Sequence, residues 1–158
     1  MLDQPLAGKS PLAFKRDRHS KERQTVNGYE IKMPIFSDTD IVTARQKGRE
    51  MASRLGFTST DSTLIATAIS ELARNILLYA RQGEIILSII EEGTLRGIKV
   101  LARDEGPGIP DIGRALEEGF STSRSFGMGL SGVRRLVDEF KIVSEVGSGT
   151  TVTIKKWK

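Results

Sequence analysis

The chain has 158 residues, of which 38% are hydrophobic and 28% charged, so it can form one domain with a buried core. It has no cysteine and a single histidine, which excludes disulfides and thiolate metal sites and disfavours a histidine-ligated metal. No apolar run approaches the roughly 20 residues that span a membrane, and the N-terminus lacks a signal-peptide core. We therefore expect a cytoplasmic protein without a membrane partner.

The net charge of +4 is distributed unevenly along the chain. Residues 1–25 contain six basic and three acidic groups, a net +3, so the other 133 residues carry only 4 − 3 = +1. This distribution predicts a basic, disordered tail over 1–25, with a partner-binding arm as the alternative, and a globular domain over 26–158. A folded domain so close to neutral gives no reason to expect a nucleic-acid partner.

The globular pattern begins with a strand and a helix. Apolar and polar residues alternate over 29–35, as in a half-buried strand, and Pro34 favours an edge position. Residues 38–40 supply capping side chains, and apolar residues then recur at helical spacing over 41–55 until Gly56 ends the segment.

A second helix is expected to open at Thr60 or Asp61 and to end before Gly83. Its apolar positions fall on one stripe, formed by Ile65, Ile69, Leu72, Ile76 and Tyr79. Two strands should follow, over 84–92 and 98–103.

Residues 104–125 are rich in Gly, Pro, Ser and Asp, with one helical piece at 111–118, and such a long irregular stretch predicts a functional lid. A third long helix is marked by Leu130, Val133, Val137 and Phe140. A hairpin over 141–146 and 150–157 closes the domain. The order β, α, α, β, β, lid, α, β, β predicts an α/β two-layer sandwich.

Glu71 and Asn75 stand four residues apart on the second predicted helix, so both project from one surface. An amide oxygen suits Mg²⁺, and a neighbouring carboxylate can accept a proton from an attacking hydroxyl. Glu and Asn at this spacing also occur by chance on exposed helices, so the pair is not diagnostic by itself.

The run DEGPG, from Asp104 to Gly108, directly follows a predicted strand. Gly106 and Gly108 would let the backbone come close to a flat ligand. A buried Asp104 could accept a hydrogen bond from the exocyclic amine of adenine, which would distinguish adenine from guanine. A plain Asp-Gly-Pro turn is the alternative.

Glycine-rich sequence also opens the third helix, as GMGLSG, which contains Gly127, Gly129 and Gly132. Free backbone N–H groups at a helix start favour an anion such as phosphate. A dinucleotide-binding Rossmann motif is excluded, because that motif follows a strand and this one follows the lid. GSGT, ending at Thr150, is either a hairpin turn or a contact to the adenine edge.

These motifs, ExxxN on a helix, DxGxG after a strand, a lid, GxGxxG on a helix and a final GT, together resemble the GHKL family over roughly residues 31–157. The resemblance implies a Bergerat-type ATP-binding domain, with an antiparallel or mixed sheet covered by helices and a short lid. It implies Glu71 as base, Asn75 for Mg²⁺ and Asp104 for adenine. The pocket and phosphate contacts that it implies are Gly106, Gly108, Gly127, Gly129, Gly132 and Thr150.

Within that family, the stretches ISELARNILLYA, EEGFSTS and GLSGVRRLVDEF look like the switch serine/threonine kinases of the stressosome. That likeness implies transfer of the γ-phosphoryl group of ATP to STAS-domain scaffold and antagonist proteins, followed by binding and activation of a PP2C-type phosphatase. An anti-sigma factor that sequesters a sigma subunit would use the same pocket, and a nonenzymatic adenine-nucleotide sensor is a further alternative. A sensor histidine kinase is disfavoured, since His19 lies in the tail.

Overall fold

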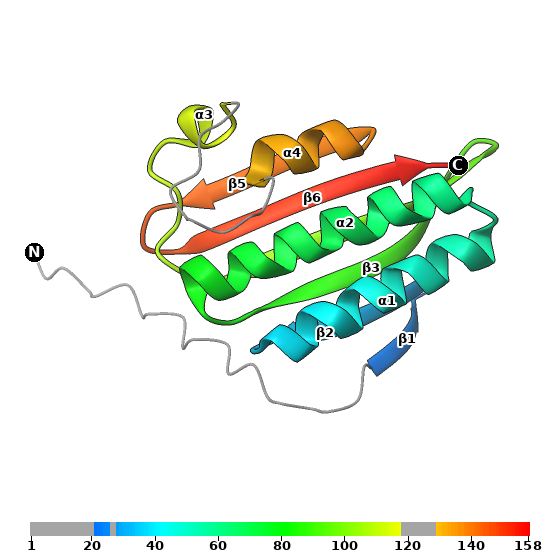
Figure 1. Cartoon of the computed structure of the whole chain (residues 1–158), viewed down its shortest axis with the longest axis horizontal. Coiled ribbons are helices and arrows are strands. Elements are labelled where there is room, and N and C mark those ends of the chain that lie inside the picture. Colours follow the sequence, from blue (N-terminus) through cyan, green and yellow to red (C-terminus); the bar gives the residue numbers. More distant parts are fainter. Residues whose placement is uncertain (1–20, 26–27, 118–128) are drawn as a thin grey trace, which may run out of the picture.

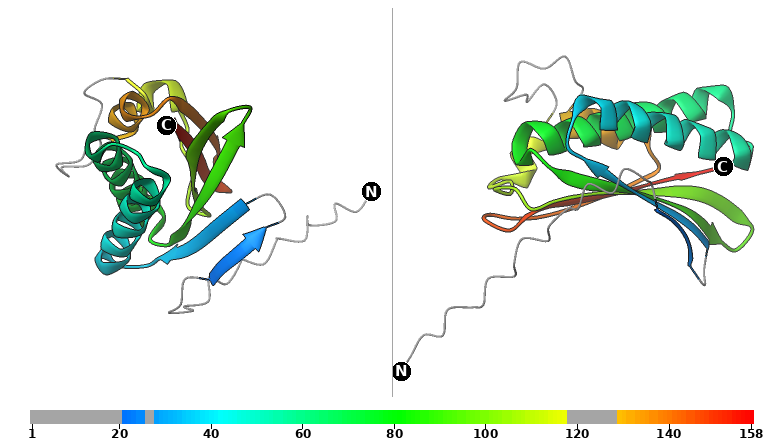
Figure 2. Two further views of the ribbon diagram at one scale, coloured as in Figure 1. Left: turned by 90° about the vertical axis from the view of Figure 1, so that its right-hand side faces the viewer. Right: turned by 90° about the horizontal axis from the view of Figure 1, so that it is seen from below.

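The computed structural model describes residues 21–25, 28–117 and 129–158. Within these residues, six antiparallel strands form one sheet in the order β1-β2-β3-β4-β6-β5, and the helices cover one of its faces (Figure 1, Figure 2). The elements are β1 (Lys21–Thr25), β2 (Gly28–Ile35), α1 (Asp38–Leu55), α2 (Ser59–Asn75), the π-helix η1 (Ile76–Ala80), β3 (Gly83–Glu92), β4 (Leu95–Asp104), α3 (Ile112–Ala115), α4 (Gly129–Leu136), β5 (Glu139–Glu145) and β6 (Gly149–Trp157). This arrangement confirms the predicted two-layer sandwich with an antiparallel sheet.

The core lies between the sheet and α1, α2 and α4. On the central strands every second residue faces the helices, so that Leu87 of β3 stands opposite Val100 of β4, both almost fully buried. Each buried aliphatic side chain of this size contributes about 1.5–3 kcal/mol. The largest fully buried side chains are Ile35, Ile65, Ile69, Leu72, Ile85, Leu87, Ile98, Val100 and Val133.

The two long helices pack closely because α1 carries Gly48 at the contact with α2. A Cβ at this position would overlap the Cδ1 atom of Ile69. The start of α1 is capped by Asp40, whose carboxylate accepts the backbone N–H groups of Phe36 (2.8 Å) and Ser37 (3.0 Å). Gly56 ends the helix in the left-handed conformation, at φ 85°, as the sequence predicted.

The N-cap of α2 differs from the prediction. Thr58 is the cap, and its hydroxyl accepts the backbone N–H of Asp61 at 3.1 Å, so the helix starts before Thr60. A Thr-Ser-Thr-Asp run offers several competing caps, and sequence reasoning picked later ones in the series. The predicted apolar stripe of α2 is correct up to Ile76 but wrong for Tyr79, which is 50% exposed. The winding changes to a π-helix after Asn75, and its wider turn moves Tyr79 out of the stripe.

The N-terminal boundary of the sheet also differs from the sequence prediction. Lys21–Thr25 forms β1, which pairs with β2 in antiparallel register, so the sheet includes the last residues of the segment expected to be a tail. Within the described residues this pairing extends as far as Lys32, and Pro34 pairs with Glu84 of β3.

The long helix that the sequence predicted after the lid corresponds to α4 and is shorter than predicted. It ends at Leu136, and Phe140 belongs to β5, where it stands opposite Ile154. Phe140 extended the helical pattern because its strand position also faces the core.

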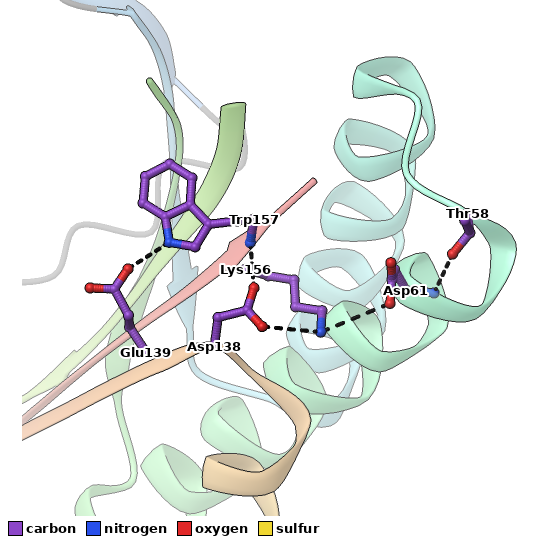
Figure 3. A network of polar contacts seen from close by, with 6 residues as sticks. All are labelled: Thr58, Asp61, Asp138, Glu139, Lys156 and Trp157. Atoms are coloured by element: carbon purple, nitrogen blue, oxygen red, sulfur yellow. Dashed lines mark hydrogen bonds and ion pairs between the residues drawn. The ribbon is translucent and has the colours of Figure 1, made fainter. Parts of the chain in front are cut away.

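Side-chain contacts fix the chain where it turns from α4 into β5 (Figure 3). Asp138 accepts the backbone N–H of Trp157 at 2.7 Å, and its other oxygen lies 3.6 Å from Lys156 Nζ. The same ammonium group lies 3.9 Å from Asp61 in the first turn of α2. Lys156 therefore links the C-terminal strand β6 to α2 and to the turn between α4 and β5. No helix among the described residues has the length and apolar character required to cross a membrane.

Candidate functional site

Asp104 is the last residue of β4 and faces the helix layer, in phase with Val100 and Ala102. One of its oxygens, Oδ1, accepts two backbone N–H groups, from Gly106 at 2.9 Å and from Thr150 at 3.3 Å. In the described part of the chain no group donates to Oδ2. Partial burial raises the pKa of Asp104, and the hydrogen bonds from Gly106 and Thr150 oppose that shift without cancelling it. The result is an oriented carboxylate with one oxygen available to a donor.

The glycines after β4 allow close backbone contacts on both sides of Asp104. A Cβ on Gly106 would lie 2.6 Å from the Cβ of Ala80 in η1, so any side chain there would collide with the π-helix. Gly108 has φ +77° and packs against the backbone of Glu145 at the β5 end. The DEGPG run is therefore more than a surface turn, because it is wedged between η1 and the β5–β6 hairpin.

Ser144 of β5 connects three parts of this region, and sequence reasoning did not find it. Its Oγ accepts the backbone N–H of Ile109 at 2.7 Å and lies 2.7 Å from Thr150 Oγ1. It also lies 3.2 Å from the carbonyl oxygen of Gly149, to which it donates. Ser144 stands opposite Thr150 in the β5–β6 register, so a small hydroxyl residue on the core-facing phase of β5 was the available signal.

Glu71 and Asn75 lie on the last turns of α2. Glu71 is 7% exposed, and its Oε1 forms an ion pair with Arg74 Nη1 at 2.7 Å. Asn75 is partly exposed as the final residue of the α-helix, and no hydrogen-bond partner for its amide is found among the described residues. The helix face that carries the pair is thus not fully solvated, because Glu71 is buried.

The π-helix η1 continues α2 and lies close to Asp104 in space. A Cβ on Gly83, just after η1, would lie 2.7 Å from Ile76 Cγ2 and 3.2 Å from the Cβ of Asp104. The C-terminal end of α2, the end of β4 and the β5–β6 hairpin all gather at the left-hand side of Figure 1. The C-terminal end of α2, which carries Asn75, therefore lies at the same end of the sheet as Asp104 and Thr150.

The structure describes only part of the glycine-rich segment 127–132. Gly129 opens α4 with φ +65°, and Gly132 lies in its first half, partly buried. Val133 of this helix is fully buried, which fixes α4 on the core beside α2. Gly127 and the last part of the predicted lid, residues 118–125, lie outside the described residues. The described part thus contains the start of α4 but does not test the predicted phosphate contacts.

The family follows from comparison with known proteins. A family model for histidine kinase-, DNA gyrase B- and HSP90-like ATPases matches residues 60–158, which is more than half of the chain. The chain belongs to this family, and its domain binds ATP.

Its relatives narrow the class further. The serine/threonine-protein kinase RsbT of Bacillus subtilis is 51% identical over 123 residues, covering 78% of this chain and 92% of that protein. The anti-sigma F factor of Geobacillus stearothermophilus is 34% identical over 121 residues, covering 72% of this chain and 81% of that protein. Family and identity together define this chain as a kinase of the partner-switching type.

Solved structures agree on the fold. The RsbU and RsbW domains of Rv1364c from Mycobacterium tuberculosis match with a TM-score of 0.52 at 22% identity. The match covers 80% of this chain and only 33% of the larger mycobacterial one. It supports the GHKL-type sandwich and says nothing of substrates.

Proposed function

We propose that this chain is a serine/threonine protein kinase of a partner-switching stress-signalling module. The observation that carries the proposal is that Glu71, Asn75 and Asp104 occupy one end of the sheet, joined through η1. A nucleotide held by Asp104 would extend its phosphates toward the end of α2 and the start of α4. The acceptor hydroxyl of the substrate, the proposed base Glu71 and the γ-phosphate would then lie together at this end of the sheet.

Asp104 is proposed to recognise adenine. Its Oδ1 is already used by two backbone N–H groups, so Oδ2 is the oxygen left for the exocyclic amine. Because a carboxylate accepts hydrogen bonds and cannot donate them when ionised, it pairs with the amine of adenine and not with the carbonyl of guanine. Thr150 supports Asp104 through its backbone, while Gly106 and Gly108 are proposed to shape the pocket by letting the loop after β4 pack closely against η1 and the β5–β6 hairpin. Gly127, Gly129 and Gly132 are proposed to contact the phosphates.

Asn75 is proposed to hold Mg²⁺ together with the ATP phosphates. Its side-chain amide fits that role, since it is partly exposed at the helix end and accepts or donates no hydrogen bond among the described residues. Magnesium commonly takes one or two protein oxygens, with water and phosphate oxygens completing its shell. When bound, the ion would reduce the charge repulsion between phosphates and nucleophile.

Glu71 is proposed to act as the base. It would accept the proton of a serine or threonine hydroxyl while that oxygen forms a bond to the γ-phosphorus. The bond between the γ-phosphorus and the β–γ bridging oxygen breaks, and ADP leaves with that oxygen. The helix start at Gly129 would supply N–H groups to the phosphate oxygens during transfer.

The proposed substrates are cytoplasmic STAS-domain proteins of the stressosome, and the proposed second partner is a PP2C-type phosphatase that the released kinase activates. The 51% identity to RsbT supports this assignment. The 34% identity to an anti-sigma F factor supports an alternative, in which the chain sequesters a sigma subunit and phosphorylates an anti-anti-sigma factor.

A phosphoryl-transfer assay distinguishes the stressosome kinase from the anti-sigma factor. The chain is incubated with γ-labelled ATP, Mg²⁺ and candidate STAS-domain proteins, beside a Glu71→Gln variant. Labelled serine or threonine that is lost in the variant supports the kinase and its base. Absence of transfer to stressosome proteins, with nucleotide-dependent binding of a sigma subunit, would support the anti-sigma alternative instead.

A further inference from the structure

Arg74 lies between the two proposed functional residues of α2 and contacts one of them. Its Nη1 atom is 2.7 Å from Glu71 Oε1, one helical turn back. The side chain of Glu71 is only 10% exposed, and Arg74 is 39% exposed. Arg74 is the donor to this carboxylate among the described residues, so it holds one carboxylate oxygen and leaves Oε2 without a donor.

A second ion pair within a helix shows what is unusual here. Glu50 and Arg54 of α1 are 2.9 Å apart, but their side chains are 49% and 73% exposed. Exposed pairs of this kind contribute little, because water solvates both charges and the long side chains lose freedom. A largely buried carboxylate cannot rely on water in the same way and depends on its protein partner. The Glu71–Arg74 pair therefore constrains Glu71 far more than the Glu50–Arg54 pair constrains Glu50.

We propose that Arg74 is a positioning residue for phosphoryl transfer. It fixes Glu71 through Oε1, so that Oε2 is presented to the acceptor hydroxyl in a single orientation. This inference rests on the proposed role of Glu71 as base. A misplaced base slows the transfer step without removing the contacts that hold the nucleotide, so the loss belongs in kcat and not in ATP affinity.

The experiment is a double-mutant cycle with Glu71→Gln, Arg74→Gln and the combined variant, beside Arg54→Gln as the matched surface control. Phosphoryl transfer and ATP affinity are measured for each, with thermal unfolding recorded in parallel. We expect Arg74→Gln to slow transfer about 10- to 100-fold with ATP affinity changed less than about 3-fold. We expect the combined variant to be no slower than Glu71→Gln alone, because Arg74 has nothing left to position. Arg54→Gln should transfer at the wild-type rate.

Two results would overturn the inference. One is wild-type transfer by Arg74→Gln. The other is a combined variant slower than Glu71→Gln by the full Arg74 factor, which would mean that Arg74 acts independently of Glu71. The second comparison holds even if Arg74→Gln folds poorly, because both variants compared lack the buried carboxylate. If the wild-type chain itself transfers nothing, the proposed function fails, and the inference falls with it.

Discussion

Asp104 and Thr150 stand directly opposite each other on β4 and β6, and the backbone N–H of Thr150 donates to Asp104 Oδ1 over 3.3 Å. Residues 46 positions apart in the chain thus orient one carboxylate. Gly149 makes this approach possible, since a side chain there would overlap the backbone of Asp104.

Asp104→Asn should weaken ATP binding. In the variant, the amide oxygen of the asparagine would accept the N–H groups of Gly106 and Thr150. Its NH₂ group would then face the exocyclic amine of adenine, so that two hydrogen-bond donors point at each other. A hydrogen bond to a charged group contributes about 1.5–3 kcal/mol, so ATP affinity should fall about 10- to 100-fold. Titration calorimetry with ATP measures this, and Asp111→Asn serves as the exposed control. Unchanged ATP affinity in Asp104→Asn would remove Asp104 from the adenine site.

The same substitution should stabilise the nucleotide-free protein at neutral pH. Burial raises the pKa of Asp104 above its ordinary value of 3.8, so the folded chain holds this proton more tightly than the unfolded chain. Stability is therefore lost as pH rises from about 3.8 through the raised pKa, and the full cost is present above it.

Urea unfolding at several pH values tests this linkage. Asp104→Asn should be more stable than the wild type at pH 7, and the difference should shrink as pH falls toward 4. Asp111→Asn should show no such trend, since Asp111 is exposed and Asn also caps α3. A stability difference that grows on acidification would contradict the sign.

Ser144→Ala should destabilise the region around Asp104 and Thr150 without disturbing the core. The backbone N–H of Ile109 and the hydroxyl of Thr150 would lose their shared partner. Leaving a partly buried donor unpaired costs about 1–3 kcal/mol. Chemical denaturation should show this loss, and ATP affinity should fall as well. Ser148→Ala, at an exposed turn position of the same hairpin, is the control, and an equal effect there would count against a specific role of Ser144.

Gly106→Ala should weaken nucleotide binding through a steric effect. The added Cβ would lie 2.6 Å from the Cβ of Ala80, so the loop after β4 must move away from η1. Such overpacking costs about 1–3 kcal/mol. Gly113→Ala is the control, because its nearest atom is 3.5 Å away and α3 tolerates alanine. Thermal unfolding and ATP titration should both separate the two variants.

Lys156→Met should destabilise the junction between α2, β6 and the turn from α4 into β5. Lys156 is 16% exposed and lies between Asp61 and Asp138, so the variant brings two carboxylates near an apolar side chain. We expect a loss of about 1–2 kcal/mol that decreases at high salt. Lys155→Met is the control, since that lysine is 34% exposed and its ion-pair partner within the described ranges is Glu139, at 3.9 Å. Equal unfolding midpoints for the two variants would contradict the role of Lys156.

The sequence by itself determined the layer architecture and the order of the site motifs. The alternating residues of β4 and the stripe from Ile65 to Ile76 report burial directly, because period 2 and period 3.6 place side chains on one face. The spacing of Glu71 and Asn75, and the position of Asp104 at a strand end, were likewise readable from local pattern.

Only the tertiary structure decided how those motifs meet. Strand pairing sets Thr150 and Ser144 beside Asp104, and no local pattern encodes which strands become neighbours. The π-helix after Asn75, the end of α4 before Phe140 and the inclusion of Lys21–Thr25 in the sheet also depend on distant contacts. The pairing of Arg74 with Glu71 was within reach of the sequence spacing, but its importance comes from burial, which only packing against the rest of the fold determines.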